Sequence, residues 1–438
     1  AEALTVTDRR RLSDSELLEH LEAATSLLGD GLLTHVQMAT ALMVETYRLV
    51  EACQELLGWD DNRVLEMLAG LSYQSTEPAR RLGELARLAA SKPELRRLLS
   101  HFDDRTAERI CGFAPEFAGR FEEYRWSPMG IRALSRDAAD PTLADQPALL
   151  LRLIANQMEG GFDPDAVDTE KASRREELAA EARRQLAGHS PLDRQRFEEA
   201  LERAERAYPL REDNVFYAVQ TPLGLIRYAA LEAGARLSQR GQIDQPDDVF
   251  FLEQDELREA LQDGEDRREL IRRRKGERAW VLAHPGPESY GRPPGDPPSL
   301  RYLPPEVRHT TDGFFWMTKG VLDKGTSQGS AEGGIQGVAA SPGRYTGTVR
   351  VILDESQFGK LRPGDVVVCP VTQPTWSVLF PSMGAVVTDS GGILSHPAII
   401  AREYGVPAVV ATGNATQIIA DGQQVAVDGE AGIVRLLD

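Results

Sequence analysis

Residues 388–403 read TDSGGILSHPAIIARE, and this stretch decides how the C-terminal part of the chain is interpreted. It joins an apolar, β-branched run, which predicts a buried strand, to a helix that starts near Pro397, because proline suits a first helical turn. Gly391 and Gly392 permit a tight turn and the close approach of a bulky group to the backbone. His396 stands where the loop meets the helix.

The surroundings of His396 are typical of an anion site. The first N–H groups of a helix and the positive end of its dipole favour a negative group attached to the imidazole. Ser395 can donate a hydrogen bond to such a group, and Arg402 supplies positive charge a turn or so later. The pattern therefore predicts that His396 accepts a phosphoryl group. The alternative is a histidine with a structural role, which is the usual case for a lone histidine.

Around this loop, the pattern of residues 335–438 predicts short strands that alternate with glycine-rich turns. The β-branched runs that predict strands lie at 347–353, 365–370, 385–388, 408–411, 424–428 and 432–436. One helix is expected among them, at about 397–404. These features predict a compact β/β/α domain of about 100 residues.

Residues 1–318 instead predict a mostly α-helical domain. Ser13 followed by Glu16 forms a capping box, and the first helix is expected to end at Gly29 and Gly31. Further helices are expected at 32–57, 61–69, 78–90, 93–100, 146–158, 169–187, 191–207, 214–240 and 267–283. The fold class is therefore multidomain, with a helical part followed by a β-rich part.

Two segments between these domains have the composition of connections. Residues 284–305 are crowded with proline and glycine and predict an extended surface segment. Residues 319–334 carry many glycines among small polar residues and predict a flexible hinge linker.

Composition excludes several classes of protein. The 438 residues contain 50 Lys and Arg against 68 Asp and Glu, a net charge of −18 that disfavours nucleic acid and anionic membranes as partners. The three cysteines are widely spaced, which provides neither a disulfide framework nor a paired-cysteine metal site. No run of about 18 apolar residues is present. We therefore expect a cytoplasmic protein without a membrane or nucleic-acid partner.

Residues 335–438 resemble the phosphohistidine swivelling domain of the phosphoenolpyruvate-utilising enzymes. The resemblance rests on AASPG at 339–343, GDVVV at 364–368, the long motif at 388–410 and VDG at 427–429. It implies that His396 is the phosphorylated histidine and that Thr388, Gly391, Gly392, Ser395 and Arg402 form its loop. Leu394 stands where pyruvate phosphate dikinases carry a regulatory threonine, so that kind of regulation is not expected.

The helical part resembles the substrate-binding domain of the rifampin phosphotransferase-like group. The motifs are GLSYQSTE at 70–77, REDN at 211–214, LEAGARLSQRGQI at 231–243 and DDVFFLEQDEL at 247–257. Residues 124–136 depart from the string that related sequences carry, so the acceptor is expected to differ from a rifamycin.

These resemblances imply a dikinase-type phosphotransferase that passes a phosphoryl group from His396 to a hydroxyl of a small organic molecule. ATP and Mg²⁺ are expected on an ATP-grasp domain or subunit, since residues 1–330 show none of its strands or its phosphate loop, and no cofactor or metal is expected on this chain. Two alternatives remain open. One is the histidine-bearing subunit of a split phenylphosphate synthase-like enzyme, and the other is a non-catalytic phosphocarrier or ligand-binding module.

An acceptor pocket would need aromatic and methionine side chains with a few polar groups. The sequence offers six candidates, which are Met38, His309, Phe315, Trp316, Arg211 and Glu212. His309 could act as a general base for an acceptor hydroxyl. The alternative for Met38 is a core position, and for Arg211 and Glu212 it is a structural ion pair.

Overall fold

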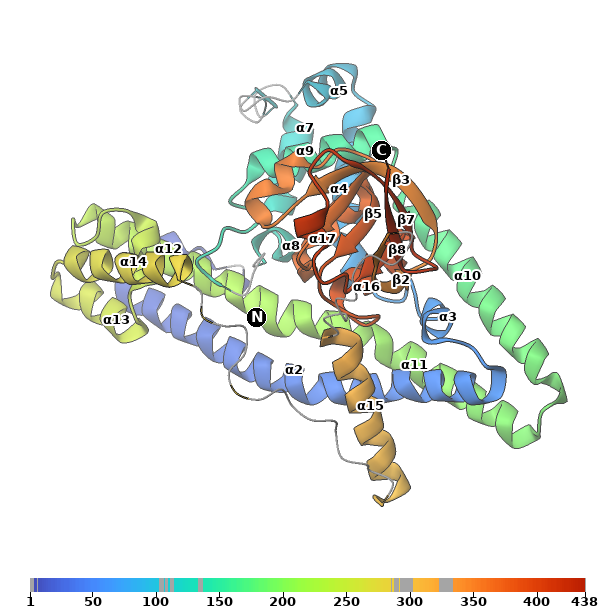
Figure 1. Cartoon of the computed structure of the whole chain (residues 1–438). Coiled ribbons are helices and arrows are strands. Elements are labelled where there is room, and N and C mark those ends of the chain that lie inside the picture. The colour runs from blue at the N-terminus through green and yellow to red at the C-terminus, as the bar shows by residue number, and fades with distance from the viewer. Residues whose placement is uncertain are drawn as a thin grey trace.

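The computed structural model describes residues 4–5, 7–101, 106, 109–110, 114–132, 137–284, 286, 291, 302–322 and 334–437. Figure 1 shows long helices that carry a mixed sheet on one side, so the expected order of a helical part followed by a β-rich part is confirmed.

Three long helices form the base of the helical part. Helix α2 (Asp14–Leu57) packs along α11 (Pro191–Val215) and, at its beginning, on α12 (Thr221–Gln239) (Figure 1). Apolar residues of α2 such as Leu49 meet Phe197 of α11 in one buried cluster, and Leu17 meets Leu237 of α12 in another. Burial of these faces removes apolar surface from water, which is the main force that holds the helices together.

The remaining helices surround this base. They are α3 (Asp61–Glu66), α4 (Tyr73–Ala90), α5 (Pro93–Ser100), α7 (Pro115–Arg125), α8 (Pro128–Ile131), α9 (Pro147–Gly160), α10 (Pro164–Gln185), α13 (Gln254–Asp263), α14 (Arg268–Ala283) and α15 (Pro305–Leu322). Short 3₁₀ turns lie at Arg9–Arg11, Leu186–Gly188 and Pro246–Phe251.

The prediction that the first helix ends at Gly29 and Gly31 is wrong. The capping box at Ser13 forms, with the Ser13 N–H donating to Glu16 Oε2 over 2.7 Å, but α2 then continues through Gly29 and Gly31 to Leu57. A Cβ at Gly31 would lie 2.0 Å from the carbonyl oxygen of Ala218. Gly31 therefore serves the close approach of a second helix and does not end the first.

The chain from Pro191 to Gln239 is also continuous where two separate helices are expected. Helix α11 passes into one π-helical turn, η3 (Phe216–Gln220), which passes directly into α12. Single π turns inside helices are frequent at functional sites, because the extra residue widens the helix and re-aims its side chains.

Helix α2 also contains an exposed apolar stretch. Among the described residues it is the one helix long and apolar enough to cross a membrane by length and composition, with mean hydropathy 1.2 over an 18-residue window of which 12% is buried. Core helices of globular proteins can pass the same test. Leu32, Leu33 and Val36 are exposed in this stretch, and we call them the α2 apolar surface.

The C-terminal sheet has eight strands in the order β1-β8-β7-β3-β4-β5-β6-β2. Their bounds are β1 Ile335–Gln336, β2 Val338–Ser341, β3 Arg344–Val351, β4 Asp365–Cys369, β5 Met383–Thr388, β6 Ala408–Val410, β7 Gln424–Asp428 and β8 Ile433–Leu437. The neighbours β3, β4, β5 and β6 run parallel, and the remaining pairs are antiparallel. The predicted strands are confirmed within a few residues, and β1 and β2 are additional.

The strands β4, β5 and β6 are buried on both faces. Val366 and Val368 point into a core within the sheet domain, whereas Val367 and Val386 point to the opposite face and join a cluster that includes Leu82 of α4. This period of two follows from the pleat of a strand. Helix α16 (His396–Tyr404) lies on this second face, so one hydrophobic core spans the sheet domain and helices α4 and α9.

The first four residues of the predicted hinge linker, 319–322, are helical. Helix α15 continues through Lys319 and Gly320 to Leu322, and residues 323–333 lie outside the described part of the chain. Most of the predicted surface segment at 284–305 also lies outside it.

Candidate functional site

His396 is the first residue of α16 and follows the loop that leaves the carboxyl end of β5. Its Nδ1 lies 2.8 Å from Oγ1 of Thr372, and its ring meets Phe380 edge to face with centroids 6.5 Å apart. Thr372 follows β4, the parallel neighbour of β5, which explains how residues 24 positions apart meet. Ligands of α/β sheets bind at this carboxyl edge of parallel strands.

The loop before His396 is closed by its own hydrogen bonds. Thr388 Oγ1 donates to the carbonyl of Ser390 over 2.8 Å, and Ser395 Oγ donates to the carbonyl of Gly392 over 2.7 Å. Gly391 has φ +113°, a conformation that side chains rarely adopt, and a Cβ there would lie 2.7 Å from Ser395 Oγ. The Ser395 hydroxyl was expected to donate to a bound anion, but in this structure it donates to the carbonyl of Gly392 within the loop.

Arg402 also holds the loop in place. Its guanidinium is fully buried and donates to the carbonyls of Ile393 and Ala340, each over 2.6 Å. These contacts tie the His396 loop to β2. Arg402 was expected to supply positive charge near His396, and its guanidinium instead binds backbone carbonyls of this loop and of β2.

His396 faces the helical part across a narrow crevice. The crevice is lined by Gln74 and Ser75 of α4, Arg132, Val215, Phe216 and Gln220 at the π turn, and Ile400 of α16. Its volume of about 10 Å³ is at the lower limit for one water molecule. The motif GLSYQSTE thus borders His396 through Gln74 and Ser75, and the segment that directly follows REDN borders it at Val215 and Phe216.

Arg132 is the residue at this crevice that sequence reasoning missed. It is 3% exposed, its Nη2 donates to Ser377 Oγ of the sheet domain over 3.2 Å, and its guanidinium lies 5.6 Å from the Phe216 ring centroid. A buried guanidinium beside a histidine can bind a phosphoryl group strongly, because the site has few competing waters. The one sign of Arg132 in the sequence was that residues 124–136, which contain it, differ from the string that related sequences carry.

The expected acceptor residues do not gather at His396. His309 Nδ1 lies 3.3 Å from Glu51 Oε2 in a separate cleft, and it precedes Gly320 by 11 residues, which is about 16 Å along α15. Trp316 Nε1 donates to Asp61 Oδ2 over 2.8 Å, with its ring against Tyr47. Phe315 is 37% exposed.

Met38 is half-buried on α2, beside the α2 apolar surface. The side chains of Arg211 and Glu212 lie outside the described part of the chain, although their backbone belongs to α11. Their neighbour Asn214 lies 3.2 Å, through Nδ2, from His35 Nδ1 on α2.

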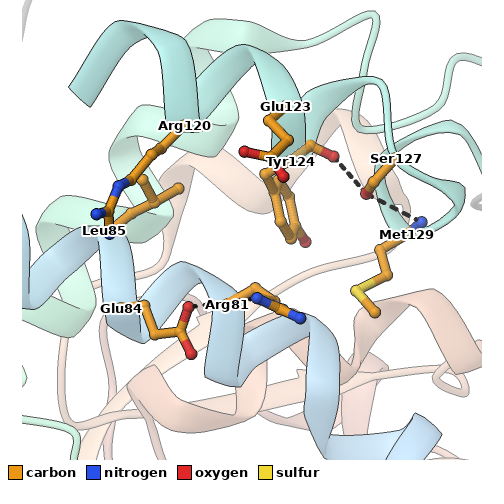
Figure 2. Close-up of a pocket in the computed structure, with 8 residues that line it drawn as sticks. All are labelled: Arg81, Glu84, Leu85, Arg120, Glu123, Tyr124, Ser127 and Met129. Atoms are coloured by element: carbon orange, nitrogen blue, oxygen red, sulfur yellow. Dashed lines mark hydrogen bonds and ion pairs between the residues drawn. The ribbon is translucent and has the colours of Figure 1, made fainter. Parts of the chain in front are cut away.

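A larger pocket of about 380 Å³ lies between α4 and α7 (Figure 2). Figure 2 shows Tyr124 across its centre, with Arg81 and Glu84 of α4 on one side and Ser127 and Met129 on another. Burial raises the pKa of the Tyr124 phenol well above its ordinary value, so the hydroxyl stays protonated. The segment from Tyr124 to Arg132 therefore borders both this pocket and the His396 crevice.

Comparison with known proteins gives two matching family models. Residues 361–432 match the mobile domain of PEP-utilising enzymes, and residues 34–212 match the fourth domain of rifampicin phosphotransferase. A rifampicin phosphotransferase from Streptomyces sp is 28% identical over 96% of this chain and 46% of its own length. An uncharacterised phosphotransferase of Bacillus subtilis is 28% identical over 92% of this chain and 47% of its own.

Chondramide synthase of Chondromyces crocatus is also 28% identical, over 92% of this chain and 10% of its own length. The chain spans about half the length of the two phosphotransferases, and a tenth of the synthase.

Proposed function

We propose that His396 carries a phosphoryl group and delivers it to a hydroxyl of a small organic acceptor bound by the helical part, since the chain is similar to rifampicin phosphotransferases and to the mobile domain of PEP-utilising enzymes. The observation that carries the proposal is the position of His396 at a crevice that Arg132 and the π turn border. The donor in this proposal is ATP with Mg²⁺, bound by a separate ATP-grasp domain or subunit.

The hydrogen bond to Thr372 supports Nε2 as the nucleophilic atom. Nδ1 lies 2.8 Å from Oγ1 of Thr372, and in this proposal Nδ1–H donates to that hydroxyl, which leaves the lone pair of a neutral imidazole on Nε2. In the first step the lone pair of Nε2 attacks a phosphorus atom of ATP, the Nε2–P bond forms, and the P–O bond breaks with its electron pair leaving on the departing oxygen of the nucleotide. In the second step the acceptor oxygen attacks phosphorus, the Nε2–P bond breaks, and the proton of the acceptor hydroxyl leaves to water.

Two features would stabilise the transferred group. The N-terminal N–H groups of α16 begin at the same residue that carries it, and Arg132 borders the same crevice. Negative charge is spread over three oxygens during phosphoryl transfer, so fixed donors and a fixed cation lower the barrier.

The α2 apolar surface supports an acceptor that is largely apolar. It lies on the helix that touches the π turn, since Gly31 packs on Ala218 and His35 lies beside Asn214. Tyr217 of the π turn accepts a hydrogen bond from Gln74, which lines the crevice, over 3.0 Å. An exposed apolar surface that borders polar groups is typical of a ligand site.

We expect incubation with Mg²⁺ and ATP, with an ATP-grasp donor module present, to add about 80 Da to the chain. The adduct should be acid-labile, as phosphohistidine is, and should be absent from His396→Gln. His101→Gln is the matched control, because His101 is exposed and does not line the crevice, and it should still be labelled. Intact-mass spectrometry decides the matter, and equal labelling of His396→Gln would refute the proposal.

A further inference from the structure

The last turn of α15 touches the His396 loop backbone to backbone. The N–H of Leu394 donates to the carbonyl of Gly320 over 2.8 Å. A Cβ at Gly392 would lie 2.4 Å from that same carbonyl oxygen, and a Cβ at Gly320 would lie 3.2 Å from the Leu394 Cβ. The contact is therefore built on two glycines, neither of which leaves room for a side chain.

The Leu394 side chain adds an apolar anchor to this contact. It is fully buried among Met43 of α2, Leu65 of α3 and Trp316, Met317 and Val321 of α15. The partners come from three helices of the helical part, while Leu394 belongs to the sheet domain and precedes His396 by two residues.

Helix α15 is itself fixed to the helical part. Trp316 Nε1 donates to Asp61 Oδ2 over 2.8 Å, and the Tyr47 ring lies between those of His309 and Trp316, at 5.3 and 5.7 Å. Gly313 packs on Tyr47 at the point where α15 crosses α2. The last turn of α15 is thus a fixed surface for the loop.

We propose that the last turn of α15 is the docking element that positions the His396 loop at the helical part, with Gly320 and Leu394 as its positioning residues. The role of this docking element in catalysis rests on the proposed function. Because the crevice has room for about one water molecule, His396 must move away from the helical part before an acceptor can be admitted beside it. In this proposal the contact between the loop and α15 opens in that movement. The docking element therefore sets how often His396 is accessible.

Accessibility of His396 can be measured without any phosphorylation, through modification by diethyl pyrocarbonate located by peptide mass spectrometry. Gly320→Val places methyl groups where Leu394 lies and should raise the modification rate of His396 about tenfold, relative to exposed His101 and His284 of the same molecule. Gly276→Val is the matched control, since a Cβ at Gly276, also in a helix, meets nothing within 4 Å. An unchanged His396 rate in Gly320→Val would overturn the proposal.

A cross-link tests the same contact without a bulky substitution. The Cβ separation of 3.2 Å between positions 320 and 394 is close to the range of about 3.5–4.5 Å found in disulfides, so Gly320→Cys with Leu394→Cys should bridge on oxidation. Cys53 and Cys369 are buried, and burial raises the pKa of the Cys53 thiol to about 12, so neither should interfere. Cys111 lies outside the described residues and is replaced by serine.

The oxidised double variant should lose His396 modification about tenfold, and dithiothreitol should restore it. Each single-cysteine variant is a control that should show no dependence on dithiothreitol. The docking proposal would be overturned if the disulfide fails to form, or if the modification rate of His396 is the same with and without the disulfide. A chain that docks by these measures and is never phosphorylated on His396 would instead refute the proposed function.

Discussion

Replacing Arg132 with alanine should slow phosphoryl transfer from His396 to an acceptor about 10²- to 10³-fold, the loss found when one preorganised donor is removed from a transition-state site. The guanidinium is 3% exposed and borders the same crevice as His396, where water competes little. Arg132→Lys should recover only part of the rate, because a lysine keeps the charge and loses the planar fork. Single-turnover transfer from the phosphorylated chain measures the rate directly.

Controls for Arg132 must separate charge from docking, because Arg132 Nη2 also donates to Ser377 across the two parts of the chain. Ser377→Ala removes that bond and keeps the guanidinium, so its transfer rate should stay within a few-fold of wild type. Arg120→Ala removes an exposed arginine at the larger pocket and should have no effect. Transfer by Arg132→Ala at the wild-type rate would remove Arg132 from the mechanism.

The second large effect is expected on stability. Arg402→Ala should lower the free energy of unfolding by about 3–5 kcal/mol, since two charge-assisted hydrogen bonds to carbonyls are lost and a cavity is left in their place. The two carbonyls, of Ala340 and Ile393, would be left buried without their donor. Arg402→Lys should restore only a part, because one ammonium cannot reach both carbonyls in the same geometry.

Urea denaturation followed by circular dichroism measures the effect of Arg402→Ala. Arg435→Ala is the control, because Arg435 lies exposed on β8 of the same domain, and its change should stay within about 0.5 kcal/mol. A shift for Arg402→Ala no larger than that of Arg435→Ala would show that the buried guanidinium does not hold the loop.

Local patterns predicted the local structure well. The capping box at Ser13, the β-branched strands and the helix that starts at His396 each depend on residues within a few positions of one another. The motif at 388–403 also predicted which histidine stands at a helix start beside a glycine turn. Such features are set by propensity and spacing, which the sequence displays directly.

The errors arose where distant contacts decide the outcome. Gly31 lies at a helix crossing that involves Ala218, and Gly320 lies in α15 where the His396 loop packs on it, and neither glycine ends its helix. Arg132 reaches the crevice through a contact with Ser377, 245 positions away. No local period contains that information, because it depends on how the sheet domain docks on α4 and α9.

A single hydrophobic core joins the sheet domain to α4 and α9. This core determines what any second docking position of the sheet domain would have to provide. If the domain leaves, residues such as Phe380 and Ile400 on one side and Leu82 on the other become wetted, at about 25 cal/mol for each Å² of apolar area. A second docking position must therefore offer a comparably apolar face, because otherwise the population of the domain there would be very small. The relative populations of the two positions would then follow from the difference between the two buried apolar areas.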